Sequence, residues 1–448
     1  MSAHIQCYFS SEDGQAYRLT NQQDLSFSID STTLATTTIH IKPEIRYQSI
    51  LGMGASLEEA SIYNLSRMSP AESEKILHSF FNQKTGIGWN LMRICFGSSD
   101  FTAQDYYSYD DMPPGRTDLN LDNFSIQKDI DYDIIATIQK VLRINPKVKI
   151  FASPWSPPGW MKSRGSLCGG SLLHEYTPIA ARYYRKAIEA YRQLGIEIYA
   201  ITLQNEPLMV SKHYPTCKFT WQEQLEFLKI IKEEFTRHGI TTKIWIFDHN
   251  FNKAMKYPAK ILADPEGYAA CDGVAFHAYE GNAHQMAKLH EAFPGKDLFF
   301  TEYSTWGAEG IDEILIYFRN WARSYNAWVF CLDDQGQPNA GPHPADPTFI
   351  TVSHRNPEVY EYIPEYYLLG QITKFVQPGA HRVDSNYGSR RTVTNTAFLN
   401  PDGTLSLVVV NQTESPQIFQ VTCVDKTFTA TLPQKTVATY QWTWKDDA

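Results

Sequence analysis

Residues 198–208 read IYAITLQNEPL, an apolar, strand-like run that ends abruptly in an amide, a carboxylate and a proline. A second run, KDLFFTEYS at 296–304, ends in the same way and also delivers a glutamate. In a parallel α/β barrel, functional side chains lie at the carboxyl ends of the strands, where the loops open to solvent. The two runs therefore predict a barrel in which Glu206 and Glu302 meet at one mouth.

Further apolar runs divide the middle of the chain, and several stretches between them carry helix signals. One stretch begins with Ser69 and Pro70, a capping residue and a proline at the first helical position. Eight strand-plus-helix units predict a (β/α)8 TIM barrel rather than an open doubly wound sheet. No glycine-rich phosphate loop follows the first run, which disfavours nucleotide binding. The other runs are QSILGMGAS (48–56), WNLMRICFG (89–97), VKIFASPW (148–155), KIWIFDHN (243–250), GVAFHAY (273–279) and AWVFCLDD (327–334).

The two ends of the chain differ from the middle, because apolar and polar residues alternate there as in strands. LSFSIDSTTLATTTIHI at 25–41 and RTVTNTAFLNPDGTLSLVVVNQT at 391–413 are examples, and NPDG is a turn signal between two strands. We expect both ends to build one accessory β-sandwich. The predicted division is 1–46 for its N-terminal part, 47–371 for the barrel and 372–448 for its C-terminal part.

Composition excludes some classes of function. The formal net charge of −9 and the pI near 5.8 argue against a nucleic-acid partner, which would require a basic surface. Aromatic residues make up 13% of the chain, which fits a cleft that stacks on sugar rings but equally an aromatic core.

Cysteine usage and the N-terminus bear on the compartment. The seven cysteines are an odd number without a CxxC pair, which favours reduced thiols over a disulfide framework. The first residues lack the pattern of a signal peptide, and no apolar stretch is long enough to span a bilayer. We expect a cytoplasmic protein without stable membrane insertion, although a secreted chain trimmed of its signal peptide would look the same.

The pair of glutamates indicates a chemistry. Glycoside hydrolysis requires two carboxylates that flank the scissile bond, one to protonate the leaving oxygen and one to attack or stabilise the anomeric carbon. Taken singly, Glu206 or Glu302 could equally be a salt-bridge partner or a neighbour of a helix cap.

At this point the chain resembles the retaining, glucosylceramidase-like β-glycosidases of glycoside hydrolase family 30. The resemblance implies an eight-fold β/α barrel with a β-sandwich made from both ends, and a reaction that needs no cofactor. The motifs that carry it are LGMGASLEEASIYNLS (51–66), LMRICFGSSDF (91–101), ASPWSPPGWMK (152–162), ITLQNEP (201–207), GVAFHAY (273–279), FFTEYS (299–304) and YYLLGQITKFVQPGAHRV (366–383).

Carried over residue by residue, the resemblance implies roles for the residues at the strand ends. Glu206 would be the general acid/base and Glu302 the nucleophile. Asn205 would bond the sugar 2-hydroxyl. Arg93, at the end of the second run, would keep Glu302 ionised, or would pair with another barrel carboxylate such as Asp248.

Further residues would form the sugar pocket. Trp155 would line the −1 subsite, and Glu59 would accept hydrogen bonds from the sugar 4- and 6-hydroxyls. Tyr214 would bridge the two carboxylates. His277 and Tyr279 are expected in the substrate pocket without mechanistic roles.

Two departures from the family pattern leave the substrate open. The sixth-strand motif His-Trp-Tyr of glucosylceramidases reads His277, Ala278, Tyr279 here, so an aromatic wall is missing. The eighth run offers Cys331 and Leu332 where the family has a tryptophan and an asparagine. We expect a β-glucoside, with a β-xyloside, a β-fucoside or an endo-cleaved β-1,6-glucan as alternatives.

Two functions from other classes compete with this prediction. A metal-dependent barrel hydrolase could use Asp248, His249 and His277, but the chain lacks HxH after the first strand and HExxH anywhere. A non-catalytic carbohydrate-binding barrel would predict the loss of a carboxylate, and neither is lost. We expect no metal and no cofactor, and the sequence does not indicate the oligomeric state.

Overall fold

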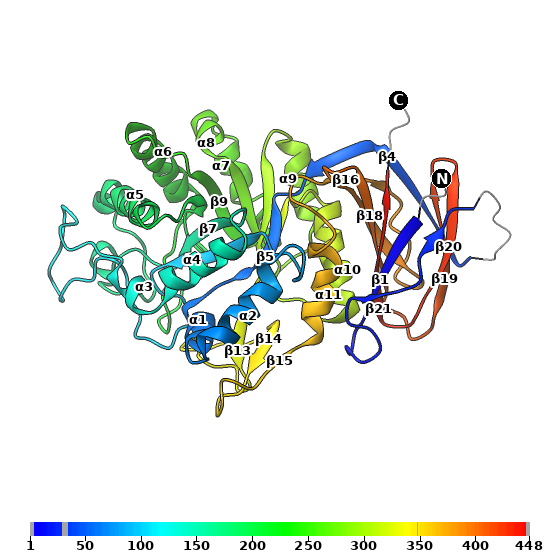
Figure 1. The fold of residues 1–448 in the computed structure, drawn as a ribbon. Helices are drawn as coiled ribbons and strands as arrows, with labels where there is room; N and C mark the ends of the chain where they lie inside the picture. Colours follow the sequence, from blue (N-terminus) through cyan, green and yellow to red (C-terminus); the bar gives the residue numbers. More distant parts are fainter. Residues whose placement is uncertain (1–3, 29–34, 347, 445–448) are drawn as a thin grey trace.

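The computed structural model describes residues 4–28, 35–346 and 348–444, and in these ranges the chain forms a barrel with a β-sandwich at its side (Figure 1). The barrel occupies the middle of the chain, whereas the sandwich is built from the blue N-terminal and the orange to red C-terminal segments. Parts of the predicted sandwich at 1–3, 29–34 and 445–448 lie outside the described residues.

The barrel is a parallel sheet in which each strand lies beside the next one in the chain, and β12 returns to pair with β5. A parallel bridge between Leu298 and Ala322 joins the two ends of the sheet. The (β/α)8 prediction is confirmed. The strands are β5 (Gly52–Ser56), β6 (Leu91–Phe96), β7 (Lys149–Pro154), β8 (Ile198–Thr202), β9 (Lys243–Asn250), β10 (Gly273–His277), β11 (Asp297–Glu302) and β12 (Ser324–Ala327).

The helices surround this sheet. The predicted start of α2 is present, since the Ser69 hydroxyl accepts a hydrogen bond from the amide of Glu72 and Pro70 opens the helix. The α-helices are α1 (Glu59–Ser66), α2 (Pro70–Phe81), α3 (Gln127–Asp131), α4 (Ile134–Ile144), α5 (Thr177–Gln193), α6 (Trp221–Arg237), α7 (Pro258–Leu262), α8 (Pro265–Ala270), α9 (His284–Ala292), α10 (Gly307–Arg319) and α11 (Pro364–Thr373). Short 3-10 turns are η1 (Gly159–Met161), η2 (His174–Tyr176) and η3 (Phe251–Lys253).

The eighth barrel strand lies before the apolar run that predicted it, so that prediction was wrong in its bounds. β12 has the sequence SYNA, and its polar side chains are buried and donate hydrogen bonds. The Ser324 hydroxyl donates to the carbonyl of Phe300, and the Asn326 amide donates to the hydroxyl of Ser56. Because buried polar residues can be hydrogen-bonded in this way, a barrel strand need not contain an apolar run, and this one was not recognised from the sequence.

The apolar run itself leaves the barrel. Cys331–Asp333 forms β13 of a small sheet with β14 (Ile350–Val352) and β15 (Tyr360–Tyr362). The end of the eighth strand therefore carries Asn326 and, just after it, Trp328, whereas Cys331 and Leu332 belong to β13.

The sandwich interleaves strands from the two ends of the chain, as predicted. β1 pairs with β21, and β4 lies between β16 and β19. The sheet folds over itself, because Phe419 of β19 and Tyr440 of β21 are ring neighbours at 5.7 Å although their strands are distant in the sheet order. The strands are β1 (His4–Ser11), β2 (Thr20–Asn21), β3 (Leu25–Ser26), β4 (Thr37–Ser49), β16 (His381–Ser385), β17 (Thr394–Leu399), β18 (Thr404–Asn411), β19 (Gln417–Cys423), β20 (Lys426–Leu432) and β21 (Thr436–Thr443).

The segment boundaries differ slightly from the expected ones. β4 continues to Ser49, beyond the expected end of the N-terminal part at 46, and residue 371 falls within α11. All seven cysteines lie in the described ranges and are free. Among the described residues, no helix combines the length and the apolar character needed to cross a bilayer.

An apolar layer fills the barrel interior at the end away from the strand carboxyl ends. Trp245 of β9 stacks on Phe299 of β11 with ring centroids 4.0 Å apart and planes at 19°. The layer consists of Leu51, Leu91, Phe151, Ala200, Trp245, Ala275 and Phe299. This packing joins strands from both halves of the barrel.

Phe299→Ala is expected to lower the free energy of unfolding by about 3–5 kcal/mol, because it removes a buried ring and leaves a cavity. Urea denaturation followed by tryptophan fluorescence measures the loss, with Phe299→Leu as the control that keeps most of the volume. A loss below about 1 kcal/mol for the alanine variant would contradict a closed, packed interior.

Candidate active site

A buried arginine organises the mouth of the barrel. Arg93 is the third residue of β6, its side chain is inaccessible to solvent, and its guanidinium forms an ion pair with Glu302. Its Nη2 also donates to Oδ1 of Asn205 at 2.8 Å and to Oδ2 of Asp248 at 3.0 Å, and its Nε donates to the Ser153 hydroxyl at 2.9 Å. Both partners considered for Arg93 from the sequence, Glu302 and Asp248, are therefore present.

Asp248 is the second carboxylate of this network and is fully buried at the end of β9. Its Oδ1 accepts from the Thr301 hydroxyl at 2.7 Å and faces Nε2 of His277 at 3.0 Å, and its Oδ2 accepts from the Thr202 hydroxyl at 2.7 Å. Burial works to raise the pKa of Asp248, but the charges of Arg93 and His277 outweigh it and hold the pKa below its usual value.

Glu206 follows β8 on a strained backbone. Its φ is +45°, in the left-handed region, and its amide donates to the carbonyl of Asp248 at 3.0 Å. Its Oε1 lies 3.5 Å from Nδ1 of His249 and 3.5 Å from Nδ1 of His277. Burial opposes ionisation, but the two imidazoles outweigh it and hold the pKa of Glu206 below its usual value.

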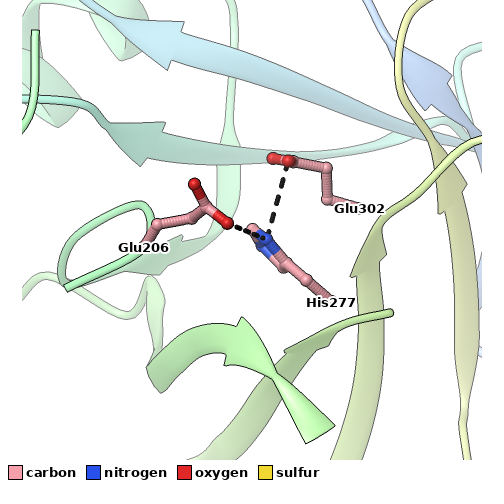
Figure 2. A group of neighbouring side chains, drawn as sticks. All are labelled: Glu206, His277 and Glu302. Atoms are coloured by element: carbon pink, nitrogen blue, oxygen red, sulfur yellow. Dashed lines mark ion pairs between the residues drawn. The ribbon is translucent and has the colours of Figure 1, made fainter. Parts of the chain in front are cut away.

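Glu206, His277 and Glu302 meet in one group (Figure 2). One atom of each, an imidazole nitrogen or a carboxylate oxygen, lies within 4.8 Å of the other two. Three such atoms could hold a metal ion, but both oxygens of Glu302 already accept hydrogen bonds, Oε2 from Arg93 and Oε1 from the Tyr279 hydroxyl at 2.8 Å. These two donors stabilise negative charge on Glu302 and occupy the oxygens that a metal ion would need.

A cavity of about 360 Å³ opens above this group. Six of the predicted site residues line this cavity: Trp155, Asn205, Glu206, Tyr214, Tyr279 and Glu302. Arg93 and His277 lie beneath its floor, since neither side chain reaches solvent. The full lining is Asp100, Phe101, Trp155, Asn205, Glu206, Met209, Tyr214, Asn250, Tyr279, Glu280, Glu302, Trp328, His343, Pro344 and Asp346.

The aromatic wall of the cavity is built by two tryptophans. Trp155 stacks on Trp328 with ring centroids 5.3 Å apart and planes at 24°. The Arg93 guanidinium lies 4.8 Å from the Trp155 ring. Trp328 was missed from the sequence because the eighth strand was placed too late, and the correct register of that strand would have found it.

Glu59 does not line the cavity, so the expected contact with the sugar 4- and 6-hydroxyls is wrong for this residue. Its carboxylate accepts from the Thr102 hydroxyl at 2.8 Å and the Ala103 amide at 2.6 Å. Asp100, in the motif GSSDF, occupies the cavity instead. Burial raises the pKa of Asp100 to about 8. Its position four residues after the end of β6 is the signal that could have identified it.

Tyr214 lies in the cavity wall, but within the described residues its hydroxyl forms no bridge between the carboxylates. Its ring faces His343 edge-on at 6.1 Å. The hydroxyl that reaches a carboxylate belongs to Tyr279, which donates to Glu302. The expected bridging role of Tyr214 is therefore taken in part by Tyr279.

Arg93→Met is expected to lower the free energy of unfolding by about 3–5 kcal/mol at pH 7, because it leaves two buried carboxylates without their cation. The loss should shrink towards pH 4.5. The stability that the wild type gains from the depressed pKa of Asp248 is lost only below the unfolded value of ~3.9, so it is still present at pH 4.5. The loss shrinks because of the variant: without the charge of Arg93, burial raises the pKa of Asp248, which takes up a proton as pH falls.

Urea denaturation of wild type and Arg93→Met at the two pH values measures this difference. Arg93→Lys, which keeps the charge but not the fork of donors, serves as the control and should lose less. An equal loss for Arg93→Met at both pH values would contradict the electrostatic explanation.

Comparison with known proteins agrees with this geometry. The glycosyl hydrolase family 30 TIM-barrel domain matches residues 50–376, and the β-sandwich domain of the same family matches residues 379–440. An endo-1,6-β-D-glucanase of Neurospora crassa is 29% identical over 92% of this chain and 89% of its own length. The lysosomal acid glucosylceramidase of Mus musculus is 25% identical over 90% of this chain and 82% of its own.

A solved structure is also similar over nearly the whole length. The endo-β1,6-glucanase BT3312 superimposes with a TM-score of 0.89 at 30% identity, covering 98% of this chain and 99% of that one. With both domains matched and the barrel accounting for most of the chain, the protein is a member of glycoside hydrolase family 30 and a glycoside hydrolase.

Proposed function

We propose that the protein hydrolyses β-glucosides with net retention of configuration, with Glu206 as the acid/base and Glu302 as the nucleophile. One observation carries the proposal: an oxygen of Glu206 and an oxygen of Glu302 lie within 4.8 Å of each other. Retaining glycosidases hold their carboxyl groups about 5–5.5 Å apart, whereas inverting enzymes need about 6.5–9.5 Å to fit a water between them.

In the first step, Glu302 attacks the anomeric carbon while Glu206 protonates the leaving oxygen. The ion pair with Arg93 and the hydrogen bond from Tyr279 orient the attacking carboxylate and stabilise its charge. In the second step, Glu206 takes a proton from water, which then attacks the glycosyl ester on Glu302.

Asn205 supports the first step through the orientation of its amide. Its Oδ1 accepts from Arg93, so the NH2 group is the end that can donate to a sugar hydroxyl in the cavity. A hydrogen bond to the 2-hydroxyl strengthens as positive charge develops on the sugar ring. Arg93 thus aligns both the nucleophile and this donor.

The sugar in the −1 subsite is proposed to be glucose, stacked on the Trp155–Trp328 wall with Asp100 as a hydroxyl acceptor. The leaving group is either a lipid, as the names of the glucosylceramidase relatives suggest, or a second sugar, as the names of the glucanases suggest. The second candidate, an endo-β-1,6-glucanase, is favoured by the exposed carboxylates Glu280 and Asp346 in the cavity lining, which suit sugar hydroxyls.

Turnover of p-nitrophenyl β-glucoside, β-xyloside, β-fucoside and β-galactoside by the wild type and two variants tests the proposal. Glu302→Gln is expected to abolish turnover of the sugar that is cleaved. Glu206→Gln should lower kcat/KM about 10²–10⁴-fold for unactivated leaving groups. Glu280→Gln, which removes another carboxylate of the same cavity, is the matched control and should have a much smaller effect on kcat.

The same wild-type protein distinguishes the two leaving groups. Release of glucose from glucosylceramide in micelles supports the lipid candidate, and shortening of a β-1,6-glucan supports the glucanase candidate. Full activity of Glu302→Gln on any cleaved substrate would refute the assignment of the nucleophile. No turnover of any glycoside by the wild type would favour a non-catalytic carbohydrate-binding barrel.

A further inference from the structure

His277 lies between the carboxylates of the site in a way that the proposed roles do not use. It ends β10, is fully buried, and directs its two ring nitrogens to different partners. Nε2 lies 3.0 Å from Oδ1 of Asp248. Nδ1 lies 3.5 Å from Oε1 of Glu206 and 3.6 Å from Oε1 of Glu302, and Figure 2 shows the ring between these two side chains.

This setting favours a proton on Nδ1. Within the described part of the chain, Nδ1 forms no hydrogen bond, yet carboxylate oxygens of Glu206 and Glu302 lie within 3.6 Å of it. Burial opposes a charged imidazole, but Glu302 and Asp248 outweigh it and raise the pKa of His277 to about 10. The charged or titratable groups around the ring are Arg93 on β6, Glu206 after β8, Asp248 and His249 on β9, Tyr279 after β10 and Glu302 on β11.

In the resting site, Glu206 therefore lacks the proton that a general acid must donate. The imidazoles that hold the pKa of Glu206 low also remove the proton that Glu206 must give to the leaving oxygen. A proton on Nδ1 of His277 is within 3.5 Å of the same carboxylate. The proton is displaced from the acid but remains inside the site.

We propose that the proton used by Glu206 in the first step is stored on Nδ1 of His277, and that the loss of negative charge on Glu302 releases it. The inference rests on the proposed function. His277 is a positioning residue in this scheme, because it acts on substrate through Glu206.

The step balances in atoms and charge. As an oxygen of Glu302 bonds to the anomeric carbon, the bond from that carbon to the leaving oxygen breaks, and the electron pair stays on that oxygen. One proton moves from Nδ1 to the Glu206 carboxylate, and the carboxyl passes a proton to the leaving oxygen. His277 and Glu302 both end neutral, Glu206 keeps its charge, and the leaving group departs as a neutral alcohol.

The second step reverses the transfer. Water gives a proton to Glu206 as it attacks the ester, Glu302 regains its charge, and the proton returns to His277. Contact with Glu302 is what couples the imidazole to the reaction. His249 also lies 3.5 Å from Glu206, but in the described contacts it pairs with neither Glu302 nor Asp248.

The charge of His277 can be read directly by ¹⁵N NMR of the imidazoles at pH 7.5. The free wild type is expected to show His277 charged. Glu302→Gln, and the wild type carrying a 2-deoxy-2-fluoroglucosyl ester on Glu302, are expected to show it neutral. The same imidazole charge with and without the Glu302 carboxylate would overturn the proposal, whereas failure of the wild type to form the ester would count against the proposed function.

Kinetics of His277→Gln at pH 7.5 provide the second test. Its kcat/KM for an alkyl β-glucoside should fall about 100-fold or more, as for loss of general acid catalysis, while that for 2,4-dinitrophenyl β-glucoside, whose leaving group needs no proton, should change little. The alkaline limb of the pH profile should move to lower pH, and His249→Gln should move it less. Equal losses on both substrates with an unmoved limb would indicate a structural role and overturn the proposal.

Discussion

The buried guanidinium of Arg93 is the constraint on which the rest of the site depends. A charge with no access to water is costly unless it is paired and fully hydrogen-bonded. The barrel meets this requirement with groups from several strands: Ser153 of β7, Asp248 of β9 and Glu302 of β11, together with Asn205 just after β8. The same contacts that keep the arginine in the interior also align the proposed nucleophile and the amide beside the proposed acid.

The backbone at the mouth is held as tightly as the side chains. Phe247, Asp248 and Glu206 all have positive φ, at 77°, 60° and 45°, a conformation that costs energy for residues other than glycine. The amide of Glu206 is held by the carbonyl of Asp248, whose carboxylate is held in turn by Arg93. The strained backbone at Glu206 is thus held in place through the ion pair of Asp248 with Arg93, so the positions of Glu206 and Glu302 are linked through these two residues.

Much of this architecture could be predicted from the sequence. Strands β8 and β11 are apolar runs; β11 ends in Glu302, and Glu206 lies four residues after the end of β8. Their position and the meeting of the two glutamates follow from barrel geometry. The eighth strand could not be found in the same way, because Ser324 and Asn326 are polar and are buried only through specific partners. The eighth strand was therefore predicted at the next apolar run, part of which forms β13 of a separate sheet.

Individual contacts in loops were the least predictable part of the site. Glu58 and Glu59 are adjacent acids, and nothing in their spacing shows that Glu59 turns to Thr102 while Asp100 occupies the cavity. Choosing between Tyr214 and Tyr279 as the partner of a carboxylate likewise depends on loop paths. The Arg93 network was partly predictable, because an arginine buried within a barrel strand requires carboxylate partners.

The measurement that tests the central claim most directly is ¹H NMR of the anomeric proton of the sugar in the first minutes of hydrolysis of an aryl β-glucoside. The close approach of Glu206 and Glu302 predicts that the β-anomer of glucose appears first and only later equilibrates with the α-anomer. Initial release of the α-anomer would show inversion, and would contradict the assignment of Glu302 as a covalent nucleophile.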